Sequence, residues 1–131
     1  MLSQAAILLT ALLFGGMVLY SFGFALFLFS ALPADAAGPL LRRAFPHFYL
    51  FVIGCALCGA ALTAAIDMTS TVILGLIAVT ALLARQILMP AINGATDTGN
   101  RARFGVLHTG SVLVTLAHIA GSSAVILRLA A

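Results

Sequence analysis

Six arginine and three aspartate side chains are the only charged side chains in this chain, and they leave four long uncharged stretches. The stretches cover residues 1–34, 44–66, 68–84 and 104–127. A helix needs about 17–25 mostly apolar residues to cross the hydrocarbon core of a bilayer. Charged residues make up 7% of the chain, whereas about 25% is usual in a soluble domain. The sequence therefore predicts an integral membrane protein with four spans.

The four stretches predict α-helices rather than strands. Strands of a membrane β-barrel alternate apolar and polar side chains over about 10 residues, and these stretches are apolar throughout. Within lipid, every backbone polar group needs a partner in the protein, and a helix provides one for each. We expect one all-α domain over residues 1–131, an antiparallel four-helix transmembrane bundle with spans at about 5–31, 46–65, 70–89 and 104–127.

Proline and aspartate mark the predicted ends of the spans. Pro33 disfavours helix in the residue before it and is expected to end the first span. Pro39 can open a short helix at the membrane interface, and Pro46 suits the first turn of the second span. Asp67 offers an N-cap for the third span. The segment 91–103 is rich in turn-forming residues, so we expect a loop there.

The arginines also predict how the bundle is oriented. With four spans, the first and third loops share one side of the membrane, and these loops hold Arg42, Arg43, Arg101 and Arg103. The positive-inside rule keeps arginine-rich loops in the cytoplasm. We therefore expect both termini on the extracytoplasmic side, in the inner (cytoplasmic) membrane of a bacterium. The arginines lie at span ends and form no basic face, so a nucleic-acid partner is not expected.

The fourth span carries the most regular polar pattern of the chain. Its members recur every three or four residues and fall on one stripe of a helix: His108, Ser111, Thr115, His118 and Ser122. Polar side chains on a lipid-embedded helix face protein or a wet cavity. The stripe predicts either hydrogen bonds between helices or the wall of a ligand-binding groove.

A polar cluster is expected near the cytoplasmic side of the bundle. A rise of about 1.5 Å per residue places Arg85, His108 and Tyr49 at similar depths. Arg85 either extends alone toward the headgroups, or joins His108 and Tyr49 in a cluster that would bind an anionic ligand or a lipid phosphate. The predicted ligand-binding residues are Arg85, His108, Tyr49 and Ser111. No aspartate lies inside a span and no nucleophile–base arrangement is visible, so we expect no catalytic residue and no enzyme activity.

Histidine and cysteine leave two cofactor alternatives open. Cys55 and Cys58 share one helical face, and with His118 at a similar depth they could hold a soft ion such as Cu(I). Their neighbours are small residues, which is more typical of close helix packing. His47 and His108 could be axial ligands of a haem b, although they differ in depth by about one turn. We predict no cofactor and no metal, with haem and copper as the alternatives.

The first span predicts a packing face. Gly16, Tyr20, Gly23 and Phe27 recur every three or four residues and combine small with large side chains. Tyr20 lies near the middle of the membrane, where its hydroxyl needs a partner. We expect it to donate to a neighbour such as Thr115.

Several short segments, spread over about residues 15–115, resemble the transmembrane protein 205-like family. They are Leu32-Pro33, Gly38 and Phe45-Pro46 in the first loop, residues 85–90 with Asn93 at the end of the third span, and Phe104-Gly105-Val106-Leu107-His108 at the start of the last. The resemblance implies a four-helix membrane domain without a settled biochemical activity. His47 and His118 depart from the family pattern, which weakens the haem and copper alternatives.

The sequence thus predicts a small polytopic membrane protein that binds a small ligand, a lipid or a partner at the polar cluster and catalyses no reaction. One alternative is an accessory or structural subunit of a larger membrane complex, or a homo-oligomer. A second alternative is a haem-binding or soft-metal-binding membrane protein. Membrane lipids are partners in every case.

Overall fold

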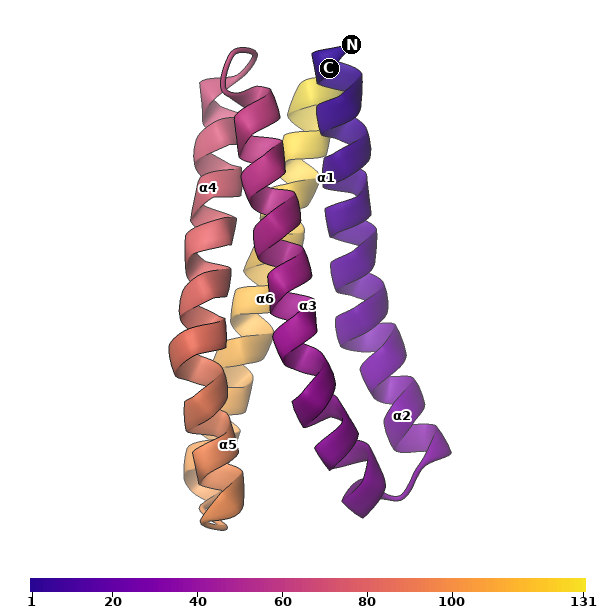
Figure 1. The fold of residues 1–131 in the computed structure, drawn as a ribbon, viewed down its shortest axis with the longest axis vertical. Coiled ribbons are helices and arrows are strands. Elements are labelled where there is room, and N and C mark those ends of the chain that lie inside the picture. Colours follow the sequence, from indigo (N-terminus) through magenta and orange to yellow (C-terminus); the bar gives the residue numbers. More distant parts are fainter.

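The computed structural model describes all 131 residues and contains four helical rods joined by short turns (Figure 1). Each rod has 30 residues and is long and apolar enough to cross a membrane. Two rods are single helices, α3 (Ala34–Thr63) and α6 (Arg101–Ala130). The other two each contain one wider π-helical segment: α1 (Leu2–Val18), η1 (Leu19–Phe24) and α2 (Ala25–Ala31) form the first rod, and α4 (Met68–Leu83), η2 (Ala84–Leu88) and α5 (Met89–Asp97) form the third.

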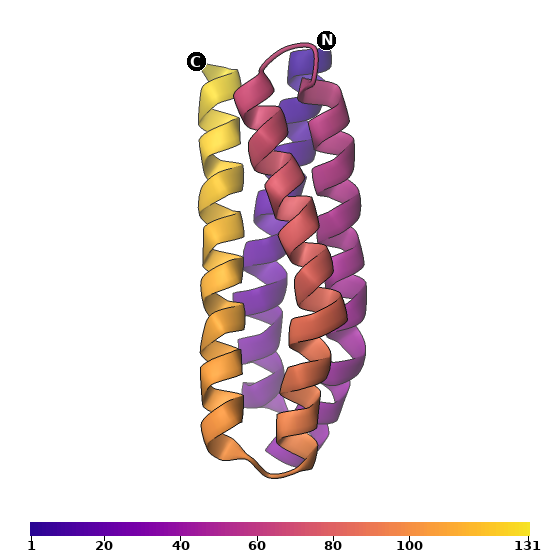
Figure 2. The same ribbon diagram turned by 90° about the vertical axis from the view of Figure 1, so that its left-hand side faces the viewer.

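The rods run antiparallel, so both termini lie at one end of the molecule (Figure 1, Figure 2). α1 packs against α3 and α6, and α4 packs against the same two helices. The α3–α4 connection lies beside the termini, at what we call the termini end. The other two connections lie at the opposite end, the arginine end, which carries Arg42, Arg43, Arg101 and Arg103. This arrangement confirms the predicted all-α four-helix membrane bundle.

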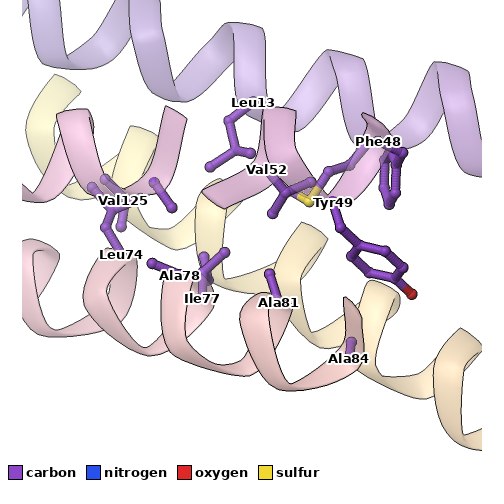
Figure 3. Close-up of a cluster of buried hydrophobic side chains, with 12 residues drawn as sticks. Leu13, Phe48, Tyr49, Val52, Leu74, Ile77, Ala78, Ala81, Ala84 and Val125 are labelled. Atoms are coloured by element: carbon purple, nitrogen blue, oxygen red, sulfur yellow. The ribbon is translucent and has the colours of Figure 1, made fainter. Parts of the chain in front are cut away.

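Apolar side chains occupy both the inside and the outside of the bundle. The central cluster draws on all four rods, and Figure 3 shows it from close by; its largest fully buried members are Leu13, Met17, Val52, Leu74 and Val125. Only 24 of the 131 residues are buried, so most apolar side chains face outward, among them Leu8, which is 72% exposed. Water disfavours an apolar surface of this extent, whereas the acyl chains of a bilayer match it.

Two helices extend further than the sequence predicts. α3 begins at Ala34 rather than near residue 46, and it passes through Pro39 and Pro46 without a separate interfacial helix. α5 continues the third rod through Pro90 to Asp97, where the sequence predicts a loop. Proline removes one backbone hydrogen bond from a helix. Membrane helices tolerate this loss because neighbouring helices and local π-turns satisfy the freed groups, and here η2 ends at Leu88, two residues before Pro90.

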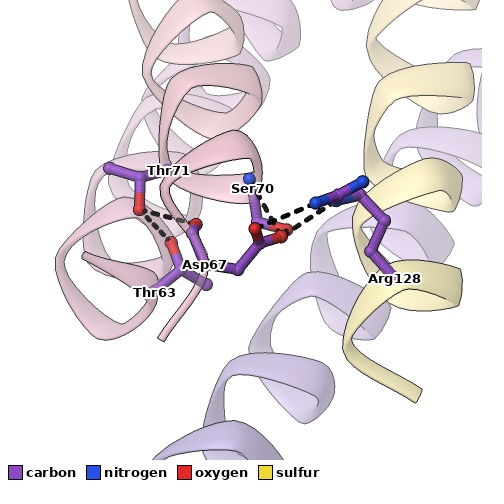
Figure 4. A network of polar contacts seen from close by, with 5 residues as sticks. All are labelled: Thr63, Asp67, Ser70, Thr71 and Arg128. Atoms are coloured by element: carbon purple, nitrogen blue, oxygen red, sulfur yellow. Dashed lines mark hydrogen bonds and ion pairs between the residues drawn. The ribbon is translucent and has the colours of Figure 1, made fainter. Parts of the chain in front are cut away.

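Asp67 is the N-cap of α4 and also connects two rods (Figure 4). Its carboxylate accepts hydrogen bonds from the backbone N–H and the hydroxyl of Ser70, at 3.2 and 2.5 Å. Arg128, near the end of α6, donates to the same carboxylate through Nε and Nη2, at 2.9 and 3.0 Å. The Arg128 guanidinium, with help from Ser70, holds the pKa of Asp67 well below its usual range. The predicted cap is confirmed, and an ion pair closes the termini end.

Candidate functional site

Two side chains from neighbouring rods donate hydrogen bonds to carbonyl groups of α3 around Phe45. Tyr20, in η1, donates its hydroxyl to the carbonyl of Ala44 at 3.0 Å. Arg85, in η2, donates Nε–H to the carbonyl of Pro46 at 3.3 Å. The prediction that Tyr20 donates to a neighbouring helix is confirmed, but Thr115 was the wrong example, because the hydroxyl reaches α3 instead of α6. We call this layer, where side chains of the π-helical segments η1 and η2 bond to α3, the π-turn level.

Beyond the π-turn level the rods separate into two pairs, α2 with α3 and α5 with α6 (Figure 1). Leu28, Ala37 and Leu41 form a small apolar cluster that keeps α2 on α3. Between the two pairs lies a cavity of about 490 Å³ with walls from all four rods. Its volume is in the range of small-molecule binding sites, about 300–1,000 Å³. We call it the arginine-end cavity.

The arginine-end cavity is lined by apolar side chains and by polar groups that lack partners in the protein. Phe45, Met89 and Phe104 are among its apolar walls. Tyr49 is only 6% exposed, and Figure 3 shows its hydroxyl pointing away from the core cluster. This hydroxyl makes no hydrogen bond with the protein, yet some of its surface is exposed rather than enclosed. A cavity that combines apolar walls with a few such groups suits an amphipathic molecule.

The α6 wall of the cavity carries His108 and Ser111. The Ser111 hydroxyl donates to the backbone carbonyl of His108 at 2.7 Å, so it is occupied within its own helix. The imidazole of His108 stacks on the ring of Phe104, with centroids 5.4 Å apart and planes at 8°. Its two ring nitrogens have no hydrogen-bond partner in the protein and are free to contact a bound molecule, as is the amide of Asn93 on the neighbouring helix α5.

An ion pair crosses the cavity at the arginine end. Arg42, on α3, donates Nη1 to Oδ1 of Asp97 at 2.7 Å and Nη2 to Oδ2 at 2.9 Å, and Asp97 is the last residue of α5. The two side chains are 43% and 57% exposed. Arg42 and Asp35 both line the cavity. The remaining arginines at this end, Arg43 and the two on α6, form no ion pair.

Three of the four predicted ligand-binding residues line one cavity: Tyr49, His108 and Ser111. The fourth, Arg85, is not in its walls, because its guanidinium is held by the Pro46 carbonyl and by the side chain of Gln86. Arg42 supplies the cation at the cavity instead. Sequence reasoning missed Arg42 because it placed the residue in an interfacial helix rather than in α3. That these residues bind a ligand stays a prediction.

The histidine and cysteine pairings of the cofactor alternatives are not brought together. His47 lines a separate groove of about 760 Å³ between the first rod and α3, together with Gly16, Tyr20 and Phe27. His108 lines the arginine-end cavity, so the two imidazoles belong to different openings. No three histidine, cysteine or acidic side chains gather where they could hold a metal ion.

His118 and the two cysteines lie in surroundings that differ from those of a soft-metal site. His118 is buried, and its Nε2 lies 2.6 Å from the hydroxyl of Thr80 on α4. Cys58 is exposed on the outside of α3 and Cys55 is half-buried. Gly59, the next residue along α3, lies so close to Leu74 of α4 that an added Cβ would lie 3.0 Å from the Cδ1 of Leu74. Part of the small-residue run therefore packs against α4, as predicted.

The polar stripe of α6 divides into two parts. Towards the termini end Thr115, His118 and Ser122 are buried. His118 bonds across to Thr80 of α4, and Ser122 donates to the carbonyl of Ile119 within α6. Towards the arginine end His108 and Ser111 form a cavity wall. The interpretation as hydrogen bonds between helices is confirmed at His118, whose partner lies on α4, whereas the ligand-binding groove stays a prediction.

The family described as "Domain of unknown function (DUF4149)" matches residues 8–101. The chain belongs to this family. The DUF4149 match takes in most of the first rod, the second and third rods, and the first residue of α6, so His108 and Ser111 lie outside it. No curated protein and no solved structure matches the chain.

Proposed function

We propose that this DUF4149 protein binds an amphipathic small molecule or lipid in the arginine-end cavity and catalyses no reaction on it. The observation that carries the proposal is one cavity with walls from all four spans, apolar for most of its surface and supplied with polar atoms that have no partner in the protein. Tyr49, His108 and Asn93 provide these atoms. The Ser111 hydroxyl donates to the backbone carbonyl of His108 and is not hydrogen-bonded to an imidazole or carboxylate, which supports binding rather than catalysis.

Filling the cavity tests the proposal. An added Cβ at Gly38 or at Gly54 would meet nothing within 4 Å, and both residues lie on α3. Gly38 lines the cavity, whereas Gly54 is exposed on the outside of the bundle. We expect Gly38→Phe to remove lipids or small molecules that co-purify with the protein in mild detergent, measured by native mass spectrometry. Gly54→Phe is the matched control, and equal loss in both variants would contradict the proposal.

The orientation and membrane belong to the same proposal. The arginine end would lie in the cytoplasm and both termini outside, in the inner membrane of a bacterium. The likeness of the first loop and of the last span to the transmembrane protein 205-like family supports a shared domain plan. A reporter enzyme that works only in the cytoplasm, fused after Ala131, should be silent; an active fusion would reverse the orientation.

A second candidate is an accessory subunit of a membrane complex or a homo-oligomer. Gly54 and Cys58 form a small-residue face four residues apart on α3, and both are exposed on its outer side rather than packed on a neighbouring rod. Such spacing lets two membrane helices approach closely. Oxidative cross-linking of Cys58 in native membranes tests this candidate, with Cys58→Ser as control. A cross-linked dimer that is lost in Gly54→Leu would favour it.

A further inference from the structure

Resting on the proposed function, we infer that the arginine-end cavity recognises a phospholipid with an ethanolamine headgroup. Its phosphate would bind the guanidinium of Arg42, and its primary ammonium would bind the carboxylate of Asp35. Both side chains line the cavity, one of each sign. The inference goes beyond an unspecified amphipathic ligand because it names the two charges that read the headgroup.

Arg42 keeps donors available while it is paired with Asp97. A guanidinium has five N–H donors in a planar fork, and the ion pair uses one on Nη1 and one on Nη2. The rest are free for phosphate oxygens, which suit the fork as carboxylates do. Asp97 therefore positions the guanidinium without blocking it. A phosphate is bound by addition to the pair, and the pair does not have to break.

Asp35 supplies the complementary negative charge. It forms no ion pair and no hydrogen bond with another side chain. It precedes Arg42 by seven residues on α3, which is about two turns and about 10 Å along the axis. Seven residues bring both to nearly the same face of the helix. The long side chain of Arg42, together with the two-carbon link between the phosphate and the ammonium of ethanolamine, can span this distance along α3.

The sign pattern argues against the other common headgroups. A purely anionic headgroup would satisfy Arg42 but would leave its negative charge beside the unpaired carboxylate of Asp35. A choline headgroup carries a cation without N–H groups, so it cannot donate hydrogen bonds to that carboxylate. Only a primary ammonium offers three donors and a compact charge. The acyl chain would then follow the apolar wall formed by Phe45, Met89 and Phe104.

The test is a competition among lipids with identical acyl chains. The full-length protein is placed in nanodiscs with equal amounts of phosphatidylethanolamine, phosphatidylglycerol and phosphatidylcholine, and bound lipids are counted by native mass spectrometry. We expect phosphatidylethanolamine to be enriched about fivefold over each of the others, since hydrogen bonds to charged groups are strong but partly screened here. Soluble glycerophosphoethanolamine in excess should not displace it, because it lacks the chain. Displacement would assign the site to a free headgroup.

Single substitutions assign the two charges. Arg42→Gln should abolish retention of all phosphate-bearing lipids at this site, while Arg43→Gln, with the same change in charge next to it, should not. Asp35→Asn should remove only the preference for phosphatidylethanolamine over phosphatidylglycerol. Asp67→Asn, which removes a negative charge at the termini end, is its control. Circular dichroism verifies that each variant keeps its helices.

The outcomes separate this inference from the proposed function. Equal retention of the three lipids, all lost in Gly38→Phe, would overturn the ethanolamine inference and leave the binding cavity standing. Enrichment of phosphatidylglycerol, or an unchanged preference in Asp35→Asn, would also overturn it. Retention that does not depend on Gly38 would reject the cavity itself.

Discussion

His108 and His118 are on the same face of α6, yet their surroundings differ completely. His118 is buried and bonded to Thr80 of α4, whereas His108 is exposed at the cavity and stacked on Phe104. The sequence places the two histidines at different depths and predicts His108 as the ligand-binding one, but it does not give the buried bond of His118 to Thr80, because the partner of a side chain is set by helix packing. His118 supports the fold, whereas His108 is free for a ligand.

This contrast gives a paired prediction for the two histidines. His118→Ala should lower the free energy of unfolding by about 1–2 kcal/mol, since it removes a buried interhelical bond and leaves a void. His108→Ala should change it by less than about 0.5 kcal/mol but should reduce the amount of co-purified lipid. Unfolding in mixed detergent micelles and native mass spectrometry measure the two effects. A larger loss of lipid in the His118 variant would place the site elsewhere.

Asp67 predicts a dependence of stability on pH. Its native pKa is depressed by Arg128 and Ser70, so its charged form stabilises the fold at pH values above the unfolded pKa of about 4. This contribution is lost as the pH falls below 4 through the native value. Melting temperatures between pH 7 and pH 3 should therefore fall less steeply for Asp67→Asn than for the native protein. Parallel curves would show that the ion pair contributes nothing.

At the scale of elements, α3 is the helix on which the site depends. It passes through two prolines, and near the second one it accepts side-chain hydrogen bonds from both rods that contain a wide turn. These bonds fix the position of α3 at the level where the helix pairs diverge. The cavity begins at this level because the two bonds hold α3 there, and α3 separates from α5 towards the arginine end.

The two tyrosines test the π-turn level. Tyr20→Phe removes the bond to Ala44 and should cost about 0.5–1.5 kcal/mol of unfolding free energy. Tyr49→Phe removes a hydroxyl without a protein partner, so it should leave stability nearly unchanged. Reversible unfolding in detergent compares them directly. Equal effects would mean that the Tyr20 bond does not contribute.

Much of the fold follows from the sequence, and the site follows only in part. The charge gaps predict four antiparallel helices, and Asp67 is recognisable as a cap. The rotation of each helix about its axis and its neighbours beyond the next span are not encoded in hydropathy. For this reason the partner of Tyr20 was not predicted, and Arg85 was chosen over Arg42 as the cation of the cavity. Opposite charges in the first and third loops, Arg42 and Asp97, are the signal that could have indicated the pair.

At the scale of the whole molecule, the groove between the first rod and α3 and the arginine-end cavity are separate openings, and each contains one exposed histidine. We predict that the purified protein is colourless and binds no haem, because His47 and His108 line different openings. An absorption spectrum with metal analysis checks this. A Soret band that disappears in His47→Ala or His108→Ala would contradict it.

The ion pairs at the two ends of the bundle join helices that are packed together to different extents. At the termini end all four rods share a packed core, whereas at the other end Arg42 and Asp97 supply the side-chain hydrogen bonds between α3 and α5. At this end one exposed ion pair joins the two helix pairs across the cavity. Exposed ion pairs weaken with ionic strength and respond to nearby charges. We therefore expect the strength of the Arg42–Asp97 pair, and with it the hold between α3 and α5, to depend on the surface charge of the adjacent leaflet.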